Sequence, residues 1–466
     1  MTSIARYAER LKSDLQRGLQ GFDLVHDEDV AAACASSGHR WRSCFWSPRI
    51  TLVTFLRQVL HGNCSCRHAV AMTLAAEDGP ATPTGDSPAG QPSGDPSAYS
   101  QSRQKLPRSV LDSLNRRVVE RVGAEVGHTQ TWCGRNVVIV DGSSTTAPDV
   151  PELQKLYPQP SGQKAGCGFP VIRLLAIFCW ASGCLLEGAA DSLHVGELAL
   201  FRRLLNRLKA ETVVLGDTYY SSYYDLVLLK QHHLDGVFRL HQRRPSDLRF
   251  GTRLGEGDHL VTWTKPKILP RGVSAEEWEK VPETLTVRHV QCRIDIPGFR
   301  SRELNVVTTL LDPIAFPKLD LTQLYRDRWL VELNLRSLKT TLGMEALKGM
   351  SPEMVRKELL VYQLAYNLIR LLMWRAAGKH QVDPRWLSFA GTQQRLMAAL
   401  PHLLACRTTG ECRNLVTKLL ARIAADMLPD RPNRIEPRAV KRRPKTHRLL
   451  TRPRDEARRM AYFING

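Results

Sequence analysis

The sequence lacks an apolar run long enough to span a membrane. A membrane-spanning helix needs about 20 consecutive apolar residues, and the longest candidate, Val171 to Leu186, is interrupted by Arg173. The N-terminal residues mix acidic and basic side chains without an apolar stretch, which argues against a signal peptide. We therefore expect no membrane association and a cytoplasmic location.

Paired cysteine patterns are also missing. The 466-residue chain has eleven cysteines, an odd number that is scattered along it, and this favours reduced thiols over a disulfide framework. One local cluster occurs at Cys64, Cys66 and His68, but no second cysteine pair stands at the distance that a structural zinc site requires. The sequence therefore indicates neither a disulfide scaffold nor a zinc finger.

Acidic residues are too few to balance the basic ones. The sequence has 46 Asp and Glu against 66 Lys and Arg, a formal net charge of +20. Such an excess favours a polyanionic partner, with nucleic acid as the first candidate and an anionic membrane surface as the second. Hydrophobic residues make up 43% of the chain, which is typical of a globular protein and, at this length, of more than one folding unit.

Composition and hydrophobic periodicity divide the chain into five expected segments. Apolar strands alternate with amphipathic helices in the central part, which indicates an α/β fold. In chain order, the segments are a helical domain (1–125, with a flexible Pro/Gly/Ser-rich connection at 77–99), the first part of a core (126–241), a β-rich insertion (242–303), the second part of the core with C-terminal helices (304–427) and a basic tail (428–466).

Two aspartates close apolar strands of this predicted α/β layer. Asp141 and Asp217 each end a short apolar run that we interpret as a buried strand. Groups at the carboxyl ends of strands gather along one edge of such a sheet. With Glu332 from a later helix they would suit two Mg²⁺ or Mn²⁺ ions, because hard cations prefer oxygen ligands. Taken alone, each aspartate is more simply explained as a turn residue after a strand.

The segment from Tyr325 to Lys339 presents an unusual predicted helix face. Tyr325, Arg328, Glu332 and Lys339 stand at offsets of 0, 3, 7 and 14 residues, which places them on roughly one face of a helix. Two cations and a tyrosine suit phosphate groups, and the carboxylate suits a divalent metal. The alternative is a solvated surface helix in which Glu332 pairs with Arg328 or Arg336.

These features together resemble the IS4 family of bacterial DDE transposases. The spacing Tyr325-x2-Arg328-x3-Glu332-x6-Lys339 matches the Y-(2)-R-(3)-E-(6)-K signature of that family without deviation, and the two aspartates stand upstream of it in strand context. A four-position signature is moderately specific alone and becomes strong with both aspartates.

Other segments are similar to that family as well. Residues 157–170 and the basic stretch 437–445 look like its members, so the resemblance covers most of residues 50–454. One departure occurs at 217–219, where Asp-Thr-Tyr stands in place of the Asp-Arg-Gly that many relatives carry. The departure removes a cation near a phosphate but leaves the expected metal ligand in place.

The resemblance implies a ribonuclease H-like core with a mixed sheet, split by the β-rich insertion and accompanied by N-terminal and C-terminal helices. It also implies cut-and-paste transposition of an insertion sequence. Water frees a 3′-hydroxyl at the transposon end, the hydroxyl closes a hairpin on the opposite strand, and the reopened end joins target DNA. Asp141, Asp217 and Glu332 would be the catalytic carboxylates, holding two Mg²⁺ or Mn²⁺ ions.

The implied partner is double-stranded DNA, both the terminal inverted repeats of the transposon and the target. Because two ends must be cut in concert, we expect a homodimer in the DNA complex, associated with the bacterial nucleoid. Hairpin closure bends DNA sharply, so a flipped base would need an aromatic partner. Trp263 and Trp278 are candidates, although each alone is more simply explained as a β-core residue. The candidate DNA contacts are Tyr325, Arg328, Lys339, Arg239, Trp263 and Trp278.

Two other functions remain open at this point. A catalytically silent relative could still bind DNA, although the presence of all three carboxylates argues against it. A stand-alone metal-dependent nuclease would have the same carboxylates, but it would not need the large insertion or the Lys/Arg-rich tail, which favours DNA contact through counterion release.

Overall fold

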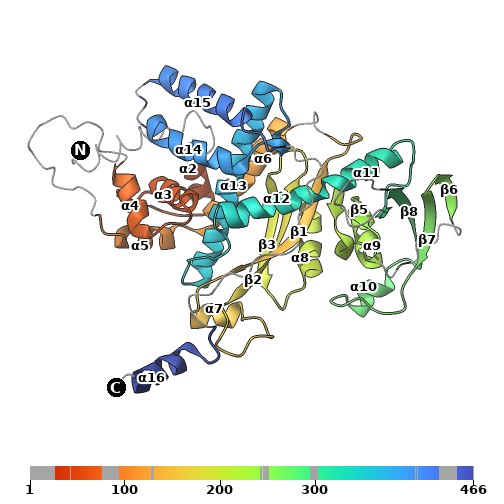
Figure 1. Ribbon diagram of the computed structural model, residues 1–466, viewed down its shortest axis with the longest axis horizontal. Coiled ribbons are helices and arrows are strands. Elements are labelled where there is room, and N and C mark those ends of the chain that lie inside the picture. The colour runs from red at the N-terminus through yellow and green to blue at the C-terminus, as the bar shows by residue number, and fades with distance from the viewer. Residues whose placement is uncertain are drawn as a thin grey trace, which may run out of the picture. The chain divides into compact units, whose positions relative to one another are not determined.

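Helices from residues 27–126 pack with helices from residues 352–424, and the chain between these two groups contributes one large sheet (Figure 1). The computed structural model describes residues 27–41, 44–75, 94–126, 131–241, 244, 251–293, 303–404, 406, 408–429 and 449–464. Two compact units result, a helical unit (Met1–Gly127, Ala181–Leu185 and Asn334–Leu428) and a sheet unit (His128–Trp180, Leu186–Leu333 and Pro429–Gly466). The expected division into five successive segments stays a prediction, and much of the expected flexible connection and of the basic tail lies outside the described residues.

The helical unit is organised around one long helix. This helix, Pro352–His380, begins where the Ser351 hydroxyl accepts a hydrogen bond from the Met354 amide and a proline opens the first turn, two features that favour helix initiation. It contacts α3, α6, α14 and α15. The helices of this unit are α2 (Asp27–Ser36), α3 (Pro48–Leu60), α4 (Cys66–Ala75), α5 (Ser97–Lys105), α6 (Arg108–Val126), α13 (Pro352–His380), the 3₁₀ turn η6 (Pro384–Trp386), α14 (Phe389–Leu404) and α15 (Thr409–Ala424).

The sheet unit is built on a mixed sheet of nine strands. Their order across the sheet is β3-β2-β1-β4-β5-β9-β8-β7-β6. The strands are β1 (Val137–Thr146), β2 (Val171–Cys179), β3 (Leu185–Ser192), β4 (Val213–Gly216), β5 (Asp235–Arg239), β6 (Thr252–Gly255), β7 (Asp258–Thr264), β8 (Thr284–Arg293) and β9 (Glu303–Thr308).

Strand direction separates a core from an extension within this sheet. β1, β4 and β5 run parallel to one another, and β2 runs antiparallel to β1. This is the ribonuclease H-like arrangement that the resemblance implies, and the expected α/β class with a mixed sheet is confirmed. The strands β6, β7 and β8 of the expected insertion are hydrogen-bonded into the same sheet through β9, which pairs antiparallel with both β8 and β5. The insertion therefore extends the core sheet directly.

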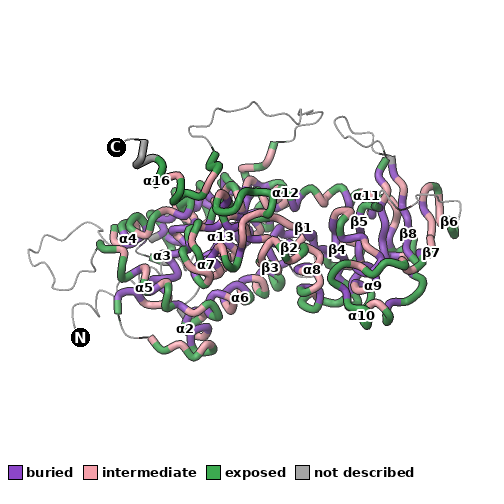
Figure 2. Tube along the Cα trace, turned by 90° about the horizontal axis from the view of Figure 1, so that it is seen from below, coloured by how far each residue is buried: buried purple, intermediate pink, exposed green. Residues whose placement is uncertain are grey.

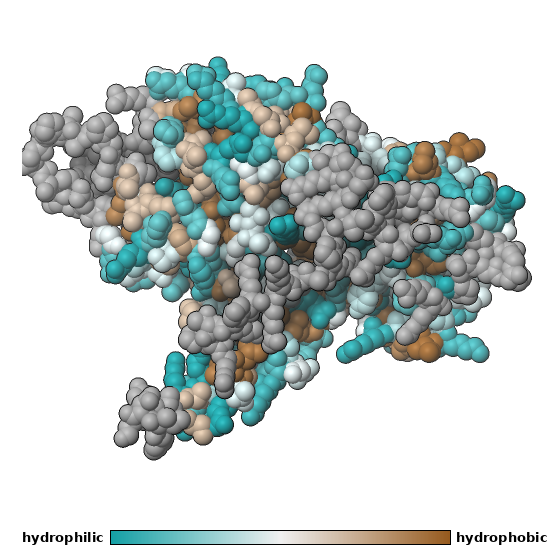
Figure 3. Space-filling view, viewed as in Figure 1, coloured by the Kyte–Doolittle hydropathy of each residue, from teal (hydrophilic) through white to brown (hydrophobic). Residues whose placement is uncertain are grey.

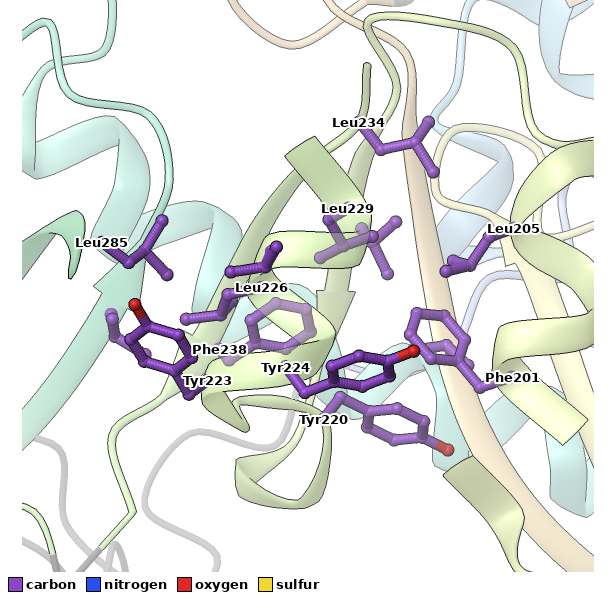
Figure 4. Packing of buried hydrophobic residues seen from close by; sticks show 14 of the residues in the cluster. Phe201, Leu205, Tyr220, Tyr223, Tyr224, Leu226, Leu229, Leu234, Phe238 and Leu285 are labelled. Carbon is purple, nitrogen blue, oxygen red and sulfur yellow. The ribbon is translucent and has the colours of Figure 1, made fainter. Parts of the chain in front are cut away.

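Helices between the strands cover one face of this sheet. Phe201 of α8, Tyr220 of η2 and Leu226 of α9 pack with alternate residues of β1, β2, β4 and β5 in one buried cluster (Figure 4). Figure 2 shows the central strands as largely buried. The helices and turns of the sheet unit are α7 (Pro151–Leu156), α8 (Glu197–Leu204), η1 (Leu205–Arg207), η2 (Thr218–Tyr220), α9 (Tyr223–Gln231), α10 (Ala275–Glu279), α11 (Lys318–Arg326), η4 (Asp327–Trp329) and α16 (Arg454–Ile464), with α12 (Leu330–Arg336) crossing into the helical unit.

Two sequence expectations about local structure are wrong. The signature segment is not one regular helix, because α11 ends at Arg326, a 3₁₀ turn follows, and the chain enters a π-helical stretch, η5 (Ser337–Thr341), after α12. The carboxylate of Asp327, the first residue of the 3₁₀ turn, accepts a hydrogen bond of 2.9 Å from the indole of Trp180. Helix periodicity in the sequence cannot predict this tertiary contact. The second error concerns Asp141, which lies inside β1, since antiparallel pairing with β2 carries that strand on to Thr146.

None of the helices that the structure describes is long and apolar enough to cross a membrane. The described surface in Figure 3 is mainly hydrophilic, with hydrophobic residues in separate small patches. All eleven cysteines are free thiols, as the odd, scattered pattern predicted.

Candidate active site

Parallel pairing places three predicted site residues at one level of the sheet. Ile139 of β1 pairs with Leu215 of β4, and Leu215 pairs with Val237 of β5. Asp141, Asp217 and Arg239 each come two residues after one of these paired residues. Because paired strands lie about 4.8 Å apart and side chains alternate between faces, these three residues are neighbours on the face opposite the buried cluster.

The Asp141 carboxyl group is mostly shielded from water. Its Oδ1 accepts a hydrogen bond of 2.8 Å from the backbone amide of Gly142. Burial raises the pKa of Asp141 from its ordinary 3.8 to about 6, and the charges of Asp217 and Glu197 add to the rise, while the Gly142 amide and Arg328 oppose it. A carboxyl group in this position is destabilised when charged, and a cation beside it would relieve that cost.

Asp217 directly follows β4, as the sequence predicted. Its Oδ1 accepts a 2.7 Å hydrogen bond from the Tyr219 amide, so Asp217 caps the short turn η2. That cap orients the carboxyl group at the carboxyl end of the parallel strands, where sites form in open α/β sheets.

Two signature residues interact electrostatically with these aspartates, Arg328 with Asp141 and Tyr325 with Asp217. Arg328 donates a hydrogen bond of 3.1 Å to Oε1 of Glu332. Burial acts to lower the pKa of Arg328, but Tyr325, Glu332 and Asp141 outweigh it and raise the pKa, so the guanidinium stays charged. Burial raises the pKa of Tyr325 to about 12, against the opposing charges of Arg328 and Arg239, so its hydroxyl stays protonated. The Arg328–Glu332 pair, which the sequence alone could explain as a surface interaction, therefore also interacts electrostatically with Asp141.

The donor set fits a hard divalent cation. Asp141, Asp217 and Glu332 offer only carboxylate oxygens, the ligands that Mg²⁺ and Mn²⁺ prefer. Among the residues that the structure describes, however, no three Asp, Glu, His or Cys side chains lie close enough together to hold one metal ion. The Glu332 side chain is 65% exposed, and its carboxylate is paired with Arg328.

Comparison with known proteins identifies the family. Residues 132–368 match the family model described as "Transposase DDE domain", and this stretch contains both aspartates and the whole signature. The chain is a DDE transposase of the IS4 family. It is 28% identical over 368 residues to the transposase InsG for insertion sequence element IS4 of Escherichia coli K12, covering 77% of this chain and 79% of that protein.

A second relative and one solved structure show weaker likeness to this transposase. The putative transposase InsZ of Escherichia coli K12 is 28% identical over 136 residues, 29% of this chain and 46% of that one. The solved piggyBac transposase synaptic complex with hairpin DNA aligns over 89% of this chain and 87% of the other, at 10% identity and a TM-score of 0.43. A TM-score below 0.5 does not establish a shared fold.

Family membership gives this transposase its general chemistry. It is a DNA-binding enzyme that acts on phosphodiester bonds, and transposase domains of this family use divalent metal ions.

The other three predicted DNA contacts of the transposase differ in their surroundings. Lys339 is half-buried in η5 and belongs to the helical unit. Trp263 of β7 is 6% exposed, and the guanidinium of Arg244 stacks 3.6 Å from its ring centroid, so it has the surroundings of a core residue. Trp278 of α10 is half-buried against the cluster, with the Lys265 ammonium 5.2 Å from its ring centroid.

Sequence reasoning missed two residues next to the aspartates. Glu197 at the start of α8 and Tyr220 in η2 share a hydrogen bond of 2.5 Å. Burial and the adjoining Glu197 carboxylate raise the pKa of Tyr220 far above its ordinary value, so the hydroxyl is the donor. A glutamate in the first turn of a helix is favoured by the helix dipole anywhere, which explains why no pattern singled it out.

The raised pKa of Asp141 predicts how metal-free stability depends on pH. Its folded-state pKa of about 6 lies above the ordinary 3.8, so the folded state holds this proton more tightly than the unfolded state does. Its stabilising contribution is therefore full below pH 3.8 and lost as the pH rises through 6. In chelator-treated samples, we expect the melting temperature of the parent minus that of Asp141→Asn to decrease as the pH rises from 3.8 to 6 and to stay constant above that. A difference that is constant with pH would contradict it.

Proposed function

We propose that this transposase performs cut-and-paste transposition of its own insertion sequence, by hydrolysis at the element ends, hairpin closure and strand transfer to target DNA. The observation that supports this most is the placement of Asp141 and Asp217 at one level of the sheet, with Arg328 interacting with both Asp141 and Glu332. Each of these reactions is an in-line displacement at phosphorus, so one site serves all of them.

Asp141, Asp217 and Glu332 are the residues we assign to two Mg²⁺ or Mn²⁺ ions. Bound metal would supply an activated oxygen nucleophile and charge stabilisation of the leaving oxygen. Arg328, which pairs with Glu332, can exchange that carboxylate for a DNA phosphate, because guanidinium groups bind both. Such an exchange would release Glu332 toward the two aspartates.

Other residues are assigned to the DNA itself. Tyr325 keeps its proton and Arg239 stands level with Asp217, so both suit hydrogen bonds to phosphate oxygens next to the cut. Lys339 is proposed as a further phosphate contact. For a flipped base, Trp278 is the better stacking candidate, because Trp263 is almost wholly buried under Arg244.

The proposed partners are the terminal inverted repeats and the target DNA, engaged by a homodimer. Two ends cut in concert need two active sites, and this chain offers one set of the three carboxylates. The net charge of +20 supports contact with long DNA, and we place the protein at the nucleoid in the bacterial cytoplasm.

The test is a product analysis on a DNA fragment that carries the element ends, labelled at either terminus. With Mg²⁺ or Mn²⁺ we expect a new 3′-hydroxyl end first, then a hairpin that migrates as one strand of double length under denaturing conditions, and then joined product. Cleavage without hairpin or joining would favour a stand-alone nuclease. Binding of the ends without any cleavage would favour a catalytically silent DNA-binding protein.

A further inference from the structure

A fourth carboxylate lies next to the paired aspartates. Glu197 opens α8 directly after Gly196, and it is half-buried. The other face of Asp141's own strand is turned toward α8, since Val138 and Val140 belong to the cluster that contains Leu200 and Phe201. The first turn of α8 therefore packs against β1 next to Asp141, on the other face of that strand.

The Tyr220 hydroxyl holds this carboxylate in place. Tyr220 is 0% exposed, and its ring packs edge-on against Phe201 with centroids 5.1 Å apart. Figure 4 shows its ring beside those of Tyr224 and Phe201, with the hydroxyl pointing away from the cluster. The hydroxyl donates to Oε1 of Glu197 at 2.5 Å. Because Tyr220 follows Asp217 by three residues, the same turn presents both groups.

The backbone of β1 leaves room for the Glu197 carboxylate only because residue 142 is glycine. A Cβ at Gly142 would stand 2.0 Å from Oε2 and 2.1 Å from Cδ of Glu197. The carboxylate thus lies against the residue next to Asp141, and Oε2 has no hydrogen-bond donor among the described residues. The charges of Asp217 and Glu197 both act on Asp141, and Arg328, the cation that opposes their effect on Asp141, is paired with Glu332.

We propose that Glu197, held by Tyr220, is a positioning residue of the divalent-cation site and adds a fourth carboxylate to its charge. The inference rests on the proposed function, since it presupposes metal at Asp141 and Asp217. It is distinct from a packing role: a glutamine at 197 would accept the Tyr220 hydrogen bond equally well, whereas only a charged group attracts a cation.

The experiment measures Mn²⁺ binding directly, by the loss of the free-ion electron paramagnetic resonance signal, with the full-length protein and no DNA. We expect Glu197→Gln to weaken binding about 10-fold or more, the range seen when groups outside the direct ligands are lost. Tyr220→Phe should weaken it less, because the charge remains but its position is no longer held. Glu279→Gln, an exposed glutamate of α10, is the charge-matched control and should bind as the parent does.

Asp141→Asn distinguishes an error in the metal site itself from an error in the role of Glu197. If the parent binds no Mn²⁺, or Asp141→Asn binds as well as the parent, the metal site itself is misassigned. If Asp141→Asn loses binding and Glu197→Gln keeps it, only the role of Glu197 is overturned. Melting temperatures without metal identify a merely structural effect, which would lower stability while leaving the Mn²⁺ affinity of the folded fraction intact.

Gly142→Ala provides an independent variant. The added methyl group displaces the end of a flexible side chain, so the fold should tolerate it while the Glu197 carboxylate moves away. We expect weaker Mn²⁺ binding with little loss of melting temperature. In a Glu197→Gln background the same substitution should have a much smaller effect on affinity, and equal effects in both backgrounds would contradict the proposal.

Discussion

Asp217→Asn is expected to lower the rate of metal-dependent DNA cleavage by at least about 10³-fold, which corresponds to about 4 kcal/mol of transition-state stabilisation. The fold should survive, because asparagine caps turns as well as aspartate does and can still accept the hydrogen bond of the Tyr219 amide. Cleavage rates on labelled element ends, in saturating Mg²⁺, measure the effect.

Asp141→Asn should lose cleavage to a similar extent and gain stability at once. Without metal, the charged Asp141 carboxyl is disfavoured by burial and by Asp217, so a neutral side chain removes a cost. We therefore expect an inactive variant whose metal-free melting temperature at pH 8 exceeds that of the parent. Glu152→Gln, on the exposed surface of α7, is the control for loss of one charge. Cleavage within tenfold of the parent for either aspartate variant would show that the site is misassigned.

Asp258→Ala is expected to destabilise the sheet unit by about 3–5 kcal/mol, the cost of leaving one partner of a buried ion pair alone. Arg288 of β8 is 0% exposed, and its guanidinium donates to both carboxylate oxygens of Asp258 at 2.7 and 2.6 Å. It also donates to the backbone carbonyls of Asp312 and Phe316. Without Asp258 the buried charge keeps only these neutral acceptors.

The matched control for that variant is Glu283→Ala. Glu283 pairs with Lys265 at 3.3 Å, but its side chain is 84% exposed, and exposed ion pairs contribute about 0–1 kcal/mol. Thermal or urea unfolding followed by circular dichroism compares the two. Similar losses in both variants would mean that the Arg288 pair contributes no more than a surface pair.

The sequence was most informative where chemistry and periodicity coincide. Apolar runs closing on aspartates located β1 and β4, and the parallel pairing of these strands explains why Asp141 and Asp217 stand at one level of the sheet. The family signature identified Glu332 and Arg328, whose contact the structure contains. Both sources depend on spacing along the chain, and the Arg328–Glu332 contact forms although the helix is interrupted before it.

Sequence periodicity could not predict features that depend on contacts between residues distant in the chain. The break at Asp327 coincides with a hydrogen bond from Trp180, and β1 continues past Asp141 because β2 pairs with it. Residues such as Gly142 look like turn signals until that partner is known. Glu197 gave no signal at all, since its significance lies in a tyrosine that stands 23 residues further along the chain.

The continuous sheet has a mechanical consequence for the insertion. Because β9 pairs with β5 on one side and with β8 on the other, the insertion cannot swing as a hinged arm without breaking backbone hydrogen bonds. The strands β7 and β8 are therefore held at a fixed position relative to β5, and the insertion moves with the core sheet as one body.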